Sequence, residues 1–230
     1  MRKLVEIMFD NEGNRYMEIA GNSRETKPTE KVITGSLFWE TDTAKIFGFD
    51  ETPGDWLVQD KNATNIAGAT VTLGSSLTYD GTEKTQAVSS VVVGTSTLTE
   101  NTDYKVIRNK GTDAGTYTMY IIGIGEYCGY EPKAFTIAKA DGSIVADPAE
   151  LTLTAGGDDG ISALTVTGDG EMSVASSTES YATASLLNND VVVTPVAEGS
   201  ATITVSMAAS ANYNAATATI SVTVESGEET

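Results

Sequence analysis

Two stretches near the C-terminal end of the sequence alternate strictly between apolar and hydroxyl side chains. They are 201–205, with the sequence ATITV, and 217–224, with the sequence TATISVTV. Because successive side chains of a β-strand point to opposite faces, this period of two predicts strands with one apolar face and one threonine- or serine-lined face. No segment of useful length carries a helical period or helix-capping residues. The sequence therefore predicts an all-β protein.

Turn-forming residues divide most of the chain into short strands. From residue 66 onward, clusters of Gly, Asn, Asp and Thr recur at intervals of about 8 to 12 residues, which is the rhythm of β-sandwiches. At 230 residues the chain is long enough for two or three small domains. We expect a small N-terminal β-hairpin domain followed by two β-sandwiches in tandem. The expected boundaries are 1–62, 63–140 and 141–225, with a polar tail at 226–230.

Large aromatic rings gather in the stretch 34–58. The chain has five Phe and two Trp, and this stretch holds Phe38, Trp39, Phe47, Phe49 and Trp56. It is typical of a hairpin, 37–41 and 46–49, with a third short strand at 56–58. Alternation places Leu37 and Trp39 on one face and Phe38 on the other.

A small hairpin buries only one face within its own domain, so two interpretations stay open. The rings form a self-contained core, or the second face docks on a partner. The attachment candidates are Leu37, Phe38, Trp39, Phe47, Phe49 and Trp56.

The net charge is −18, which argues against nucleic acid as a partner, because phosphate binding needs clustered Lys and Arg. The charge is also uneven. Residues 141–230 contain 13 acidic and no basic residues, and the last basic residue is Lys139. Such a block repels copies of itself at low ionic strength. Solubility explains this block more simply than a specific charge-based role does.

The sequence gives little support for catalysis, export or membrane insertion. Histidine is absent, which removes the commonest general base and metal ligand. The single cysteine, Cys128, forms no internal disulfide and has no cationic neighbour, so a structural role is expected. The Gly-Asp run 156–160 lacks the ligand spacing of a calcium loop. We expect no enzyme activity, no metal and no cofactor. No signal-peptide or transmembrane run is present, which predicts a protein made and kept in the cytoplasm or released without a signal.

One resemblance covers the first quarter of the chain. Its residues are 27–29 (KPT), 35–47 (GSLFWETDTAKIF) and Trp56. This pattern resembles small proteins of bacteriophage structural gene clusters, which accompany head-fibre, head-decoration and tail-associated proteins. The resemblance implies a segment that attaches to a phage particle.

Two further resemblances concern the expected sandwiches. The runs 77–84 (LTYDGTEK), 98–104 (LTENTDY), 113–118 (DAGTYT) and 123–130 (GIGEYCGY) are similar to a bacterial immunoglobulin-like repeat. Gly199, Ala201, Ile203 and Val205 fill the Gly-x-Ala/Thr-x-Ile-x-Val signature of the bacterial immunoglobulin-like group-2 family. Both resemblances imply immunoglobulin-like sandwiches and say little about activity.

Together these patterns favour a non-enzymatic virion protein, a head decoration or head fibre, assembled in the host cytoplasm. Its expected partners are the major capsid protein or other virion proteins, with no nucleic acid and no membrane. A homo-oligomer through residues 1–60 stays open. The alternatives are a tail- or neck-associated protein and a bacterial surface module that binds carbohydrate. For host or mucus glycans, the contact candidates are Tyr127, Tyr130, Tyr181 and Tyr213.

Overall fold

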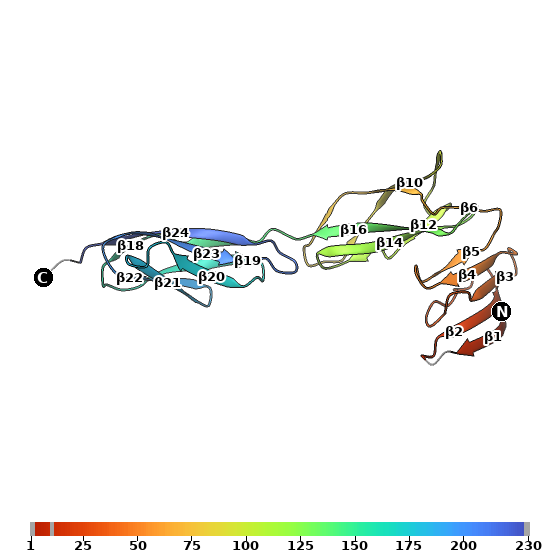
Figure 1. Ribbon diagram of the computed structural model, residues 1–230, viewed down its shortest axis with the longest axis horizontal. Helices are drawn as coiled ribbons and strands as arrows, with labels where there is room; N and C mark the ends of the chain where they lie inside the picture. Colours follow the sequence, from red (N-terminus) through yellow and green to blue (C-terminus); the bar gives the residue numbers. More distant parts are fainter. Residues whose placement is uncertain (1–2, 10–11, 228–230) are drawn as a thin grey trace. The chain divides into compact units, whose positions relative to one another are not determined.

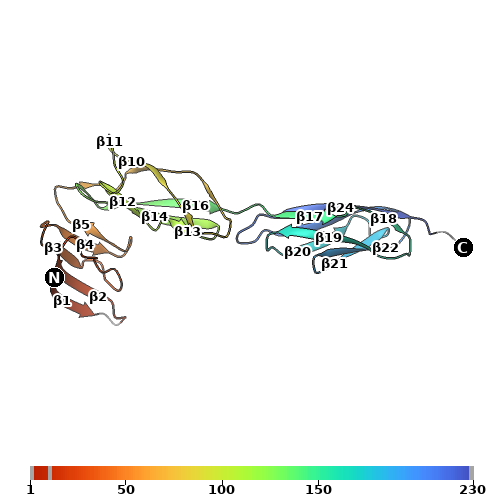
Figure 2. The same ribbon diagram turned by 180° about the vertical axis from the view of Figure 1, so that it is seen from behind.

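The computed structural model describes residues 3–9 and 12–227, and the regular elements in these ranges are all β-strands (Figures 1 and 2). The all-β prediction is confirmed. The described chain divides into two compact units. The first holds residues up to 77 with 83–111 and 116–136, and the second holds 78–82, 112–115 and the residues from 137 onward. The expected domain boundaries at 62/63 and 140/141 stay predictions.

The N-terminal part is a single five-stranded sheet. Its strands are β1 (Lys3–Phe9), β2 (Arg15–Gly21), β3 (Leu37–Glu40), β4 (Ile46–Asp50) and β5 (Asp55–Val58). They lie in sequence order, and only β2 and β3 pair parallel. The sequence predicted the strands but not this parallel pair, because its crossover, 22–36, carries no strand pattern. The structure therefore has a five-stranded mixed sheet where a small hairpin domain was expected.

The first immunoglobulin-like sandwich has two main layers, β11-β10-β7 and β12-β14-β16-β8, and two short pairs, β13-β9 and β15-β6. Figure 1 shows β10 lying over the layer that contains β12, β14 and β16. Val91 from one layer and Met119 and Ile121 from the other are fully buried. The bounds are β6 (Thr64–Asn65), β7 (Thr70–Leu73), β8 (Leu77–Thr78), β9 (Lys84–Thr85), β10 (Val88–Val93), β11 (Ser96–Thr97), β12 (Tyr104–Ile107), β13 (Lys110–Gly111), β14 (Gly115–Gly123), β15 (Tyr127–Cys128) and β16 (Tyr130–Ala138).

The second immunoglobulin-like sandwich packs the sheet β17-β19-β22-β21 on the sheet β18-β24-β23-β20. Val191 and Val193 from the first sheet meet Ile203 and Ile220 from the second in one aliphatic core. The outward positions of β23 and β24 are threonine and serine, as the period of two predicted. The bounds are β17 (Ser143–Asp147), β18 (Glu150–Thr154), β19 (Gly160–Thr167), β20 (Met172–Ser176), β21 (Ala182–Leu187), β22 (Asp190–Pro195), β23 (Gly199–Met207) and β24 (Ala216–Glu225). A strand was expected at 77–79, where β8 lies, but β17 and the other two-residue strands were missed, because they carry too few alternating residues.

Candidate functional site

One face of the N-terminal sheet forms its core. Phe38 is fully buried, and Phe49 and Trp56 are each 4% exposed. The Trp56 ring meets the other two edge-on, at centroid distances of 6.0 Å to Phe38 and 5.3 Å to Phe49. Phe47 is partly buried and packs against this cluster. Phe38, Phe49 and Trp56 are therefore core residues of the sheet, and Phe47 lies at the edge of that core. A role for these four residues in attachment stays a prediction.

The loop before β3 covers this core and is clamped to it by Lys27. Its Nζ lies 2.5 Å from Glu40 Oε1, with side chains 17% and 7% exposed. The same ammonium lies 4.2 Å from the ring centroid of Phe47 and 4.8 Å from that of Phe38, a cation–π arrangement. Thr43 Oγ1 donates to the second oxygen of Glu40 at 2.6 Å, which leaves the carboxylate fully paired.

A hydrogen bond fastens the next residue of the same loop. Trp56 Nε1 donates to the carbonyl oxygen of Pro28 at 2.6 Å. Part of the pattern KPT, GSLFWETDTAKIF and Trp56 thus has a folding role. Lys27, Pro28 and Trp56 attach the crossover loop to the aromatic face of the sheet.

The opposite face of the sheet is apolar and open to solvent. Trp39 is 53% exposed, Ile46 46% and Leu37 37%. Trp39 and Ile46 are direct cross-strand partners, and Leu37 lies two residues from Trp39 on the same face. A hollow of 190 Å³ lies among them and is lined by Glu18, Ile19, Ala20, Leu37, Trp39 and Ile46. We call this surface the outer groove.

The outer groove contains two of the six attachment candidates, Leu37 and Trp39. The sequence analysis missed Ile46, Glu18 and Ala20. Ile46 could have been predicted, because a tight hairpin pairs it with Trp39. Glu18 and Ala20 could not, since only the parallel pairing of β2 with β3 brings Glu18 opposite Leu37 and Ala20 opposite Trp39.

Three of the four tyrosines proposed for glycan contact are half-buried. Tyr130 packs edge-on against Tyr120, with ring centroids 5.8 Å apart. Tyr213 packs in the same way against Tyr79 at 5.5 Å, and Tyr127 lies in the short strand β15. None of the three forms a flat exposed platform.

Tyr181 is different, since it is 37% exposed. Its ring lies against Gly199, where a Cβ would come within 2.6 Å of it.

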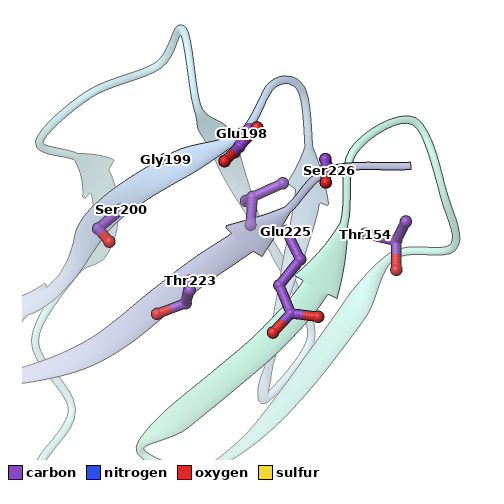
Figure 3. Close-up of a pocket in the computed structure, with 8 residues that line it drawn as sticks. Thr154, Glu198, Gly199, Ser200, Thr223, Glu225 and Ser226 are labelled. Atoms are coloured by element: carbon purple, nitrogen blue, oxygen red, sulfur yellow. The ribbon is translucent and has the colours of Figure 1, made fainter. Parts of the chain in front are cut away.

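An open groove of 770 Å³ lies nearby in the chain but is not lined by Tyr181. Its lining residues are Thr154, Glu198, Gly199, Ser200, Thr223, Val224, Glu225 and Ser226. In Figure 3 the side chains of Glu198 and Glu225 lie apart, at the turn before β23 and at the end of β24. The groove thus offers separate hydroxyls and carboxylates rather than one converging ligand set.

Within residues 3–9 and 12–227, no group of three or more His, Cys, Asp or Glu side chains is placed to hold a metal ion. No helix long and apolar enough to cross a membrane occurs in that part of the chain. Burial, and then the nearby Asp60 carboxylate, raise the pKa of the Cys128 thiol. This direction disfavours the reactive thiolate.

No family model matches the chain, and no curated protein matches it. The solved structures that resemble it include domains 4 and 5 of the S-layer protein SbsC, at 19% identity and a TM-score of 0.32, covering 68% of this chain and 96% of that one. The titin Ig tandem domains A164-A165 share 9% identity at a TM-score of 0.30, covering 70% of this chain and 97% of that one. The fibronectin(III)-like modules of Clostridium thermocellum CbhA share 11% at 0.29, covering 70% and 98%.

At such TM-scores these likenesses carry no argument by themselves. The immunoglobulin-like class follows from the paired sheets and from the residues that they bury between them.

Proposed function

We propose that this chain is a non-enzymatic structural protein of a bacteriophage particle, a head decoration or head fibre. The N-terminal sheet attaches it to the major capsid protein or to another particle protein, and the two immunoglobulin-like sandwiches are displayed. The observation that carries the proposal is the outer groove. It leaves Leu37, Trp39 and Ile46 exposed on the very sheet whose sequence resembles phage structural segments.

The charge distribution supports attachment through the N-terminal sheet and display of the second sandwich. All 14 Lys and Arg residues lie at or before residue 139, and the block after it is wholly acidic. An acidic sandwich repels its neighbours on a crowded particle surface and thus stays separate from them. Attachment through the N-terminal sheet does not use residues of this acidic block.

The test is peptide mass spectrometry on density-purified phage particles, with copy number measured against the major capsid protein. Residues 140–230 contain no Lys or Arg and therefore no tryptic site, so a second protease is required. Tens to hundreds of copies per particle support a head protein. A handful of copies moves the protein to the neck or tail. Absence from particles, together with presence on cells, overturns the proposal in favour of a bacterial surface module.

A second function, weak binding of host or mucus glycans, is favoured by the exposure of Tyr181. A part-exposed aromatic ring offers a stacking surface to a sugar. The test is binding of the full chain to immobilised gastric mucin. Tyr181→Ala is expected to reduce binding several-fold, whereas Thr219→Ala, on the exposed face of β24, leaves it unchanged. Absence of mucin binding, or equal binding by both variants, rejects this function.

A further inference from the structure

We infer that the outer groove receives one large apolar side chain of a partner protein, and that a Lys or Arg next to that side chain pairs with Glu18. The inference rests on the attachment role proposed above. It deepens that role by naming the surface and the chemistry of its occupant.

The size of the groove sets the first part of the inference. Ala20 lies opposite Trp39 across the parallel pair, and its small side chain leaves a hollow beside the indole. The hollow measures 190 Å³. An engineered apolar cavity of about 150 Å³ binds benzene, so this hollow suits a single Phe- or Leu-sized side chain. It is smaller than the usual pocket for a small-molecule ligand, which is roughly 300–1,000 Å³.

The exposed side chains have the composition of a binding hot spot. Trp is enriched at the centre of protein interfaces, where it is surrounded by apolar contacts that exclude water. Here Trp39 is flanked by Leu37 and Ile46 on neighbouring positions of the same face. Single exposed apolar residues are ordinary on protein surfaces, but three adjacent ones around a hollow are a patch.

Glu18 is the basis of the second part of the inference, the Lys or Arg on the partner. Its carboxylate lines the groove and accepts a hydrogen bond from Tyr16 Oη at 2.8 Å. In the part of the chain that the structure describes, the ion pairs join other residues, and none involves Glu18. A partner that covers the groove removes water from this carboxylate. Without a cation the desolvation is costly, so the occupant must bring one.

A second copy of this chain fits the groove poorly. The chain carries a net charge of −18. A two-fold contact through the groove would place two Glu18 carboxylates in one interface, and like charges there cost several kcal/mol. The charge complementarity therefore favours a different, basic partner surface.

The experiment is a selection of random 12-residue peptides against the immobilised full-length chain. Synthetic versions of the enriched peptides are then titrated in solution while acrylamide quenching of tryptophan is followed. Trp39 is half-exposed and Trp56 is buried, so only Trp39 is accessible to the quencher in the free chain. We expect peptides with a large apolar residue next to Lys or Arg, and protection of Trp39 on binding.

Three variants decide the result. Trp39→Ala is expected to weaken binding at least tenfold, and Glu18→Gln to weaken it several-fold and to reduce its dependence on salt. Leu187→Ala is the matched control, since Leu187 is 61% exposed in the second sandwich and should not change binding. The remaining Trp56 emission shows whether Trp39→Ala keeps its fold. The inference is overturned by binding that is indifferent to Trp39, by enrichment of acidic peptides, by no enrichment, or by self-association that protects Trp39.

The same variants separate this inference from the proposed function. A Trp39→Ala chain found at wild-type copy number on purified particles refutes the docking surface and leaves the virion function standing. A chain that selects basic apolar peptides through Trp39 but is absent from particles refutes the virion function alone.

Discussion

The N-terminal sheet and the second sandwich bury their apolar side chains with different numbers of sheets. In the sandwich, each sheet covers the other, and the aliphatic residues of both inner faces share one core. The outward face of β23 and β24 is then left to threonine and serine. The N-terminal sheet has no second sheet of its own. A loop covers one face, and the other face stays apolar and open.

This difference decides where an exposed apolar residue indicates a contact with another protein. In a two-layer fold the outward positions are free to be polar, so an isolated exposed residue such as Ile161 on β19 means little. In the single sheet, the residues of the outer groove alternate with core residues along the same strands. Trp39 is at such a position, opposite Ile46. The contact proposed for the outer groove would give its exposed ring a partner outside the sheet.

The largest expected effect tests whether the two cores are independent. Phe38→Ala should destabilise the N-terminal sheet by about 3–5 kcal/mol, because it empties the centre of the aromatic cluster. Ile203→Ala should cost the second sandwich about 2–5 kcal/mol. Both tryptophans lie in the N-terminal sheet, so their fluorescence follows its denaturant unfolding and circular dichroism follows the rest. A shift of the tryptophan transition by Ile203→Ala would show that the cores are coupled.

The next largest effect on stability is expected at the Lys27–Glu40 ion pair, which holds the crossover loop on the sheet. Lys27→Met keeps the length of the side chain but leaves Glu40 without its cation. We expect a loss of about 2–3 kcal/mol, below the range for fully buried pairs because the Lys27 side chain keeps 17% exposure. Lys110→Met breaks an ion pair of the first sandwich whose side chains are 58% and 57% exposed, and should cost under about 1 kcal/mol. Equal costs in urea titrations would mean that the clamp does not hold the loop.

Turn geometry predicts effects of opposite sign in the two regions. Ala44, in the β3–β4 turn, has φ of 57°, and Gly156, in the β18–β19 turn, has φ of 66°. Left-handed backbone is strained for alanine and free for glycine. Ala44→Gly should therefore stabilise the N-terminal sheet by about 0.5–1 kcal/mol, and Gly156→Ala should destabilise the sandwich by about 1 kcal/mol. Thermal unfolding measures both, and a loss of stability for Ala44→Gly would contradict the account.

The smallest effect concerns a second tie between the crossover loop and the hairpin. The hydroxyl and backbone N–H of Ser23 donate to the Asp42 carboxylate and hold the pKa of Asp42 below its ordinary value of 3.8. Because the folded pKa is depressed, this tie contributes above pH 3.8 and is lost as the pH falls through the folded pKa. Carboxyl NMR should show Asp42 titrating below 3.8, and Ser23→Ala should move it back toward that value. An unchanged titration would exclude Ser23 as the cause.

Much of the fold was predictable because period-two alternation and turn residues are local signals. The strands of the two sandwiches follow from them, with errors confined to short strands such as β6 and to β17. The site was predictable only in part. Alternation separated Leu37 and Trp39 from Phe38, but could not say which face the domain buries.

The sequence by itself determined that the chain is all-β, that five of its seven Phe and Trp residues lie within 34–58, and that residues 141–230 carry acidic but no basic side chains. Only the tertiary structure decided which rings are core. The crossover loop covers the Phe38 face because Lys27 and Pro28 find partners there, in Glu40 and Trp56. The parallel pairing of β2 with β3 then adds Glu18 and Ala20 to the opposite face. Contacts between residues this far apart in the chain leave no local pattern, so the outer groove exists only in the folded sheet.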